Sequence, residues 1–126
     1  MLGSTILLAA CATSPVPSAS APLVSSAYAQ PFEGSARLVI VRDTGLMGSA
    51  CTHHVYVDGE AVGQLNTGER IELHVHPGDK MLGLVVPKVC GGSVLEAAVT
   101  LRAGERKAFR SSSGQNGDVN FGPTAF

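Results

Sequence analysis

The sequence predicts an all-β domain, a small antiparallel β-sandwich of about seven strands that follows a disordered N-terminal tether. From Ser35 onward, short apolar runs alternate with turn residues about every ten positions, which is the spacing of a sandwich or barrel. Charged residues make up only 15% of the 126 residues, whereas small and β-branched residues are abundant. No part of this region shows a sustained helical period. We therefore expect one domain over residues 35–126.

The chain opens with a short apolar run, Leu2–Ala10, that is too short to span a bilayer and is typical of an export signal. The run ends in Leu8-Ala9-Ala10-Cys11, which resembles the bacterial lipobox, where a peptidase cuts before a cysteine that becomes lipid-modified. No Lys or Arg precedes the run, which departs from the usual signal. The prediction is a signal peptide over residues 1–10 and lipidation at Cys11. By the same resemblance, Ala12 after the cysteine favours the outer membrane.

Residues 11–34 are predicted to be a flexible, lipid-anchored linker. Four of the seven prolines lie here, among Ser and Ala and with almost no charge, so little apolar surface is available to offset ordering entropy. Ala27-Tyr28-Ala29 within this stretch is an alternative, ordinary secretory cleavage site. Either interpretation places the domain outside the cytoplasm.

The first predicted strand, Ala36–Arg42, is rich in β-branched residues, which indicates a central position. A glycine-containing loop, Asp43–Ala50, separates it from a second strand, Thr52–Val57. The dipeptide Asp58-Gly59 then predicts a hairpin, because a type I′ turn needs two residues that tolerate positive φ. The return strand is Glu60–Leu65.

The segment Arg70–His76 alternates between apolar and polar residues, which predicts a strand with one buried and one solvated face. Further strands are predicted over Met81–Val86, Val94–Leu101 and Arg106–Arg110, and Val119–Phe121 is a candidate edge strand. The turns between them are Asn66-Thr67-Gly68, Pro77-Gly78-Asp79 and Arg102-Ala103-Gly104-Glu105.

A family resemblance is carried by the strings Ala36–Arg42, Val55-Tyr56-Val57-Asp58-Gly59 and Val62-Gly63-Gln64-Leu65, with Gly68, Pro77-Gly78 and Ala103-Gly104. They resemble a group of uncharacterised bacterial lipoproteins, whose short β-sandwich domains are similar to the PEGA-type surface module. The resemblance spans about Ala36–Arg110 and implies architecture, but no catalytic residue or ligand. Together with the strand pattern, it predicts an immunoglobulin- or transthyretin-like sandwich.

Cys51 and Cys90 remain once Cys11 is lipidated, and such a pair predicts a disulfide in an oxidising compartment. A bridge over a loop of this length stabilises a fold by about 4 kcal/mol in the chain-entropy model. A pair of metal thiolates and two buried free thiols are the alternatives.

All four histidines lie within 24 residues. His74 and His76 are two apart on one strand, so their rings are expected on one face, where two imidazoles can chelate a divalent ion. His54, or alternatively His53, on a neighbouring strand would supply a third ligand. The alternatives to a zinc or copper site are a solvated strand face and a pH-sensitive contact surface.

Two further features are candidates for partner contact. Arg102, Arg106, Lys107 and Arg110 form a basic cluster, which would be larger if this strand paired near Arg37 and Arg42, and which suits anionic lipid or an acidic partner. A charged edge strand that prevents aggregation is the alternative. The loop after the first strand carries two adaptable apolar residues between glycines, which suit a protein contact or, alternatively, close one end of the sandwich. The predicted contact residues are Leu46, Met47, Arg106, Lys107 and Arg110.

No enzyme signature occurs in the sequence, neither a G-x-S-x-G elbow nor a phosphate-binding glycine loop nor H-E-x-x-H. Acidic and basic residues nearly balance, so no large net positive charge attracts the protein to nucleic acid. We therefore expect a non-catalytic lipoprotein of the outer membrane or periplasm, without a cofactor. It would be an accessory module that binds an envelope protein or glycan. Metal binding through the histidines and inhibition of a lytic enzyme are the alternatives.

Overall fold

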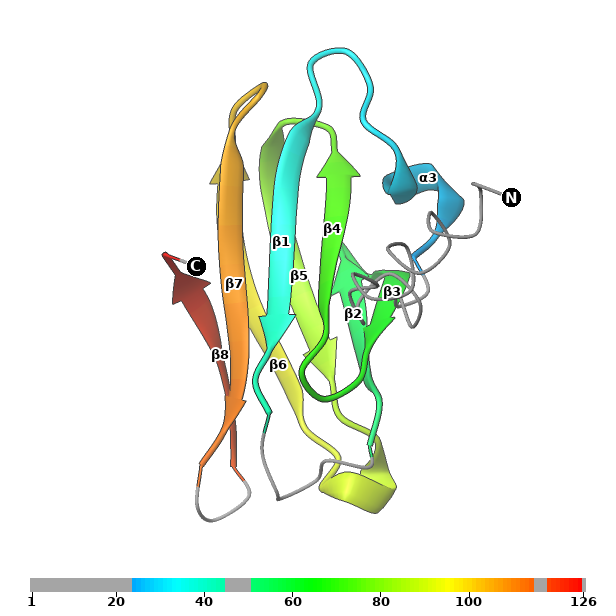
Figure 1. Ribbon diagram of the computed structural model, residues 1–126, viewed down its shortest axis with the longest axis vertical. Coiled ribbons are helices and arrows are strands. Elements are labelled where there is room, and N and C mark those ends of the chain that lie inside the picture. The colour runs from blue at the N-terminus through cyan, green and yellow to red at the C-terminus, as the bar shows by residue number, and fades with distance from the viewer. Residues whose placement is uncertain (1–23, 45–50, 115–117, 126) are drawn as a thin grey trace, which may run out of the picture.

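The computed structural model describes residues 24–44, 51–114 and 118–125. Eight strands form two four-stranded sheets that pack face to face (Figure 1). Sheet I has the order β4-β1-β7-β8, and sheet II has the order β3-β2-β5-β6. The small β-sandwich that the sequence predicts is confirmed. The strands are β1 (Ala36–Arg42), β2 (His53–Val57), β3 (Glu60–Leu65), β4 (Arg70–Val75), β5 (Gly78–Val85), β6 (Val94–Leu101), β7 (Arg106–Ser113) and β8 (Val119–Thr124). The described residues also form the short helices α3 (Ser26–Ala29) and η1 (Lys88–Cys90).

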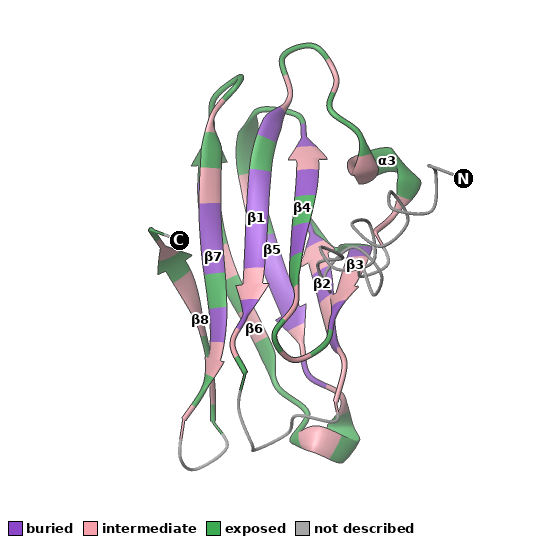
Figure 2. Ribbon diagram, in the orientation of Figure 1, coloured by how far each residue is buried: buried purple, intermediate pink, exposed green. Residues whose placement is uncertain are grey.

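The core lies between the sheets and consists almost entirely of aliphatic side chains. Alternation along each strand turns every second residue inward, and the inward aliphatic residues Leu38 and Ile40 on β1 and Leu82 and Leu84 on β5 are fully buried. Figure 2 shows the buried stretches of β1 and β5 in purple. Phe109 on β7 is the one aromatic residue among the fully buried core residues that the structure describes. Because the core is aliphatic, the side chains that are able to bind a partner lie on the two outer faces and at the ends of the sandwich.

The predicted hairpin between β2 and β3 is confirmed. Asp58 and Gly59 adopt φ values of 50° and 82°, as a type I′ turn requires. The Asp58 carboxylate also accepts a hydrogen bond of 2.8 Å from the backbone N–H of Met81 on β5. This contact joins the hairpin to the next strand of sheet II.

The pairing of β1 with β7 is parallel, whereas the sequence predicts an antiparallel sandwich throughout. The turn between β6 and β7 carries the chain from sheet II to sheet I, so β7 arrives beside β1 running in the same direction. The strand order also differs from that of an immunoglobulin domain, in which the first, second, fifth and fourth strands share a sheet. The predicted sandwich is thus confirmed, with a strand order that is not the one of an immunoglobulin domain.

Residues 24–35, which we call the strap, pack against the domain instead of forming a free linker. Val24 forms a bridge with Gly63 on β3, and Ser25 N–H donates to the Val62 carbonyl at 2.8 Å. The side chains of Val24 and Tyr28 pack against the core. The predicted linker, residues 11–34, is therefore wrong over its last part, because the strap contains apolar side chains that the sandwich buries.

The strap follows the side of the sandwich where β3 and β4 are the edge strands, and Figure 1 shows α3 beside these strands. Tyr28 donates a hydrogen bond of 2.9 Å to Glu60 on β3, and the ring of Phe32 lies 4.6 Å from the ring of His76. Covering two edges in this way leaves fewer unpaired backbone groups at the sheet margins. Within the described residues, no helix has the length and apolar character needed to cross a membrane.

Candidate functional site

Four arginines project from the outer face of sheet I. Strand alternation turns Arg37 on β1, Arg70 on β4, and Arg106 and Arg110 on β7 away from the core. The register places Arg37 directly beside Arg106, and it places Val41 between Arg70 and Arg110. We call these four residues the arginine face.

Two carboxylates partly balance the arginine face. Glu72 Oε2 lies 3.6 Å from Arg37 Nε and 3.7 Å from His74 Nε2. Asp43 accepts a hydrogen bond of 2.6 Å from Arg110 Nε, and this bond raises the pKa of the Arg110 guanidinium. For the exposed guanidinium groups of Arg70 and Arg106, the structure gives no ion pair or hydrogen bond with a described residue. The face therefore keeps a surplus of two positive charges.

The outer face of sheet II has a different character. None of the outward residues on its four described strands is Lys or Arg. Tyr56 lies beside Gly83, where an added Cβ would come within 3.3 Å of the tyrosine Cβ. Met81 and Val94 are 42% and 69% exposed on this face. Positive charge is thus confined to one of the two outer faces.

A hollow of about 460 Å³ lies where the strap meets the arginine face. Its wall combines strap residues with charged residues of sheet I, among them Gln30, Pro31, Arg37, Glu72 and His74. Because Glu72 neutralises Arg37 here, the hollow carries little net charge and extends the face without adding to its positive field.

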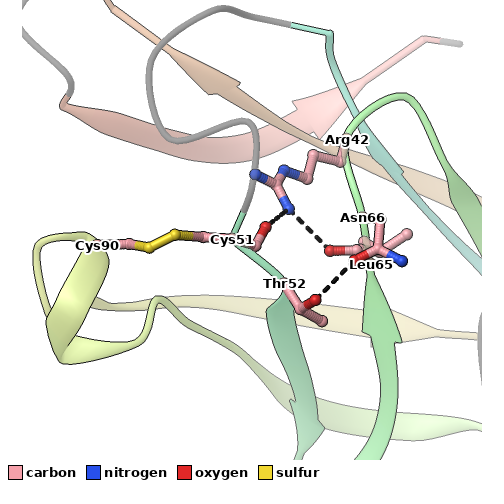
Figure 3. Close-up of a disulfide and its surroundings, with 6 residues drawn as sticks. All are labelled: Arg42, Cys51, Thr52, Leu65, Asn66 and Cys90. Atoms are coloured by element: carbon pink, nitrogen blue, oxygen red, sulfur yellow. Dashed lines mark hydrogen bonds between the residues drawn. A yellow bond between two sulfur atoms is a disulfide. The ribbon is translucent and has the colours of Figure 1, made fainter.

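The end of the sandwich near the disulfide contains a buried polar cluster. The three polar or charged residues that are buried in the described chain, Arg42, His53 and Ser111, gather here. Arg42 leaves sheet I and donates from one nitrogen to the carbonyl oxygens of Leu65, at 2.9 Å, and Cys51 (Figure 3). Both acceptors belong to the sheet II side, so this side chain joins the two sheets through the interior.

His53 points inward at the start of β2 and is only 3% exposed. Its Nδ1 is the one buried side-chain polar atom of the described chain that has no hydrogen-bond partner. Burial, the charge of Arg42 and the charge of His54, in that order, together lower the pKa of His53 to about 4. The ring is therefore a neutral, structural part of the polar cluster at neutral pH.

Cys51 and Cys90 form a disulfide, as the sequence predicts, with Cα atoms 6.4 Å apart. The bond links η1 to Cys51, two residues before β2, whose own carbonyl accepts from Arg42 (Figure 3). Thr52 donates to the Asn66 side chain at 2.6 Å on the same side. A covalent link and buried hydrogen bonds thus meet at one end of the domain.

The structure does not bring the predicted metal ligands together. His74 lies on sheet I, whereas His54 projects from sheet II on the opposite side of the sandwich, and His53 is buried. His76 lies beyond the end of β4, against Phe32. Within the described residues, no three His, Cys, Asp or Glu side chains could share a metal ion. The prediction that His54 or His53 supplies a third metal ligand is wrong, because β2 and β4 lie in different sheets.

The predicted basic contact residues have different surroundings. Arg106 and Arg110 belong to the arginine face, but Lys107 points the other way and donates to the Thr100 carbonyl at 2.7 Å. The alternative of a charged edge strand is wrong, because β7 pairs with β1 on one side and β8 on the other. Cys11, Leu46 and Met47 lie outside the described residues.

Sequence reasoning missed two residues of this site and misjudged one. Arg70 was seen only as part of a polar strand face, since nothing local indicates that β4 and β7 both flank β1. The contact of Glu72 with His74 was missed, although their spacing of two on a strand places them on one face. Arg42 was expected to enlarge the basic cluster if the first and last strands paired, yet its alternation phase with Leu38 and Ile40 indicates the interior.

Comparison with protein-family models finds no match, and comparison with curated proteins finds none either. Among solved structures, this chain is similar to the NMR structure of a protein from Eubacterium rectale, with a TM-score of 0.49 and 12% sequence identity. The similarity covers 74% of this chain and 91% of that chain.

Proposed function

We propose that this protein is a non-catalytic, lipid-anchored binding module of the cell envelope, which uses the arginine face to hold an acidic partner. One observation carries the proposal, namely the confinement of outward positive charge to sheet I. Four of the nine Lys and Arg residues stand on this face, and the outward residues of sheet II include none. A one-sided charge distribution of this kind favours binding of an anionic surface in one orientation.

The envelope location rests on the lipobox resemblance at Cys11 and on the disulfide. Disulfides persist in oxidising compartments such as the periplasm, and Cys51–Cys90 fits such a compartment. Metabolic labelling with palmitate tests the anchor. We expect label on the wild-type chain and none on Cys11→Ser, and label on neither chain would contradict the anchor.

The binding role is tested with dextran sulfate, a soluble polyanion, and the full chain carrying Cys11→Ser. We expect salt-sensitive binding in calorimetry that falls severalfold in the double variant Arg70→Gln/Arg106→Gln. These two side chains are chosen because neither is held by a described carboxylate. The control is Lys80→Gln/Lys88→Gln, which also removes two positive charges, one of them paired with Asp58 at 3.8 Å, but leaves sheet I unchanged.

Equal loss of binding in both double variants would show that only net charge matters, and it would remove the arginine face from the proposal. Unchanged binding in both variants would have the same consequence. Thermal unfolding of each variant confirms that the comparison is made between folded proteins.

A further inference from the structure

We infer that the arginine face lies against the anionic phospholipid headgroups of the membrane that holds the lipid anchor, an inference that rests on the proposed function. The acidic partner is then a lipid surface, and the domain lies flat on it through sheet I. Four features of the structure support this choice of partner.

The first feature is the spread of the arginines over a flat area. Arg37 and Arg106 are neighbours across one strand spacing, and Arg70 and Arg110 are separated by two spacings, about 10 Å. Along the strands, the two pairs lie four residues apart, which is about 13 Å. A single phosphate cannot reach all four guanidinium groups, whereas a layer of headgroups presents an anion to each of them.

The second feature is that the face is polar at its rim and has no protruding apolar residue among the described ones. Val39, at its centre, points outward yet is fully buried, which fits arginine stems that lie flat over the sheet. Met81 and Val94, two of the exposed large apolar residues of the described chain, lie on the outer face of sheet II instead. The face is therefore suited to contact with headgroups without insertion into the acyl layer.

The third feature is that the ion pairs of the arginine face are weak enough to be replaced by contacts with headgroup phosphates. Arg37 and Glu72 are about half exposed and 3.6 Å apart, and such surface pairs are held weakly. Arg110 is bound more closely by Asp43 and contributes less. Arg70 and Arg106 are the two arginines whose charge is least compensated, so they carry the largest share of the attraction.

The fourth feature is the place where the chain enters the domain. The strap joins the sandwich at β3 and passes beside β4, which is the edge strand of sheet I. Cys11 precedes Val24 by 13 positions, a length that spans at most about 45 Å. A lipid anchor at Cys11 thus keeps the arginine face close to the membrane. An acyl anchor and a basic patch together give the two signals that stable membrane attachment requires.

The test is sedimentation with sucrose-loaded vesicles of mixed phosphatidylglycerol and phosphatidylcholine, using the full chain with Cys11→Ser so that no acyl group contributes. Each arginine near an anionic surface strengthens binding about fivefold. We therefore expect Arg70→Gln/Arg106→Gln to weaken partitioning about 25-fold. The control Lys80→Gln/Lys88→Gln should bind within about twofold of the parent, since these lysines lie off sheet I.

Vesicles of phosphatidylcholine alone should bind neither the parent nor the variants. Binding to dextran sulfate without binding to anionic vesicles would overturn the lipid inference and leave the proposed function in place. Failure to bind either probe would overturn both. Equal weakening by the two double variants would exclude sheet I as the membrane-facing surface.

Discussion

Sheet I carries five arginines, and one of them differs from the other four in almost every respect. Arg42 is buried and donates to two carbonyl oxygens across the interior, whereas the arginine face is exposed to solvent. Arg42 shares the alternation phase of Leu38 and Ile40, and Arg37 occupies the opposite phase on the same strand. The position of an arginine in the inward-outward alternation of its strand therefore decides whether it stabilises the fold or remains available to a partner.

The largest expected effect concerns the disulfide at the end that Arg42 occupies. Cys51 and Cys90 are 39 residues apart, and loss of the bond in Cys51→Ser/Cys90→Ser lowers the free energy of unfolding by about 4 kcal/mol. Urea unfolding, with Cys11→Ser as the parent, measures this change. A loss below about 1 kcal/mol would show that the buried polar cluster holds this end closed without the covalent link.

The next effect compares the two kinds of arginine directly. Arg42→Met leaves the Cys51 and Leu65 carbonyls without this donor, and we expect a loss of about 3 kcal/mol. Arg70→Met makes the same chemical change on the arginine face and should alter the free energy of unfolding by less than about 0.5 kcal/mol. Equal losses in the two variants would contradict the distinction between Arg42, which stabilises the fold, and Arg70, which does not.

A third effect is the pH dependence of the buried end. The pKa of His53 is lowered to about 4, so the folded state disfavours the charged ring. Its stabilising contribution is complete above the unfolded pKa of about 6.5, and about 3 kcal/mol is lost as the pH falls from about 6.5 to about 4. Nuclear magnetic resonance titration of the His53 ring measures this pKa directly.

The control for this pH effect is the adjacent histidine, which points outward. His53→Leu should flatten the difference in stability between pH 7 and pH 4, whereas His54→Gln should keep it. A His53 pKa near 6.5 in the titration would contradict the burial of the ring.

The smallest expected effect is on the arginine face itself. Arg70→Gln/Arg106→Gln should change the free energy of unfolding by less than about 0.5 kcal/mol in urea, because exposed side chains without a described partner contribute little. A loss above about 2 kcal/mol would show that the face is part of the folding core, and would require any binding defect to be reinterpreted.

The strands were largely predictable because each one carries a local signal. The bounds of β1, β3 and β6 agree with the sequence prediction, and the Asp58-Gly59 turn was found from its φ requirement. The parallel pairing of β1 with β7 was not predictable. The turns at Asn66-Thr67-Gly68 and Arg102-Ala103-Gly104-Glu105 carry the chain between sheets, yet their sequences resemble those of ordinary hairpin turns.

The site was less predictable than the fold because it depends on strand order. Arg70 and Arg110 are far apart in sequence and share a face only because β4 and β7 both pair with β1. The buried positions of Arg42 and His53, by contrast, follow from alternation with their aliphatic neighbours. The sequence interpretation gave more weight to the polar character of these two residues than to their position in the alternation. It therefore considered both of them as candidates for surface sites.

The strap determines how the domain responds to a mechanical load that arrives from its N-terminal side. Such a pull first meets the single bridge of Val24 with Gly63 and the contact of Tyr28 with Glu60. These contacts can break one at a time. Only then does the force reach β1, which is hydrogen-bonded along its length to β4 and β7 and must be sheared from both. The strap thus yields to such a pull before the strands of the sandwich separate.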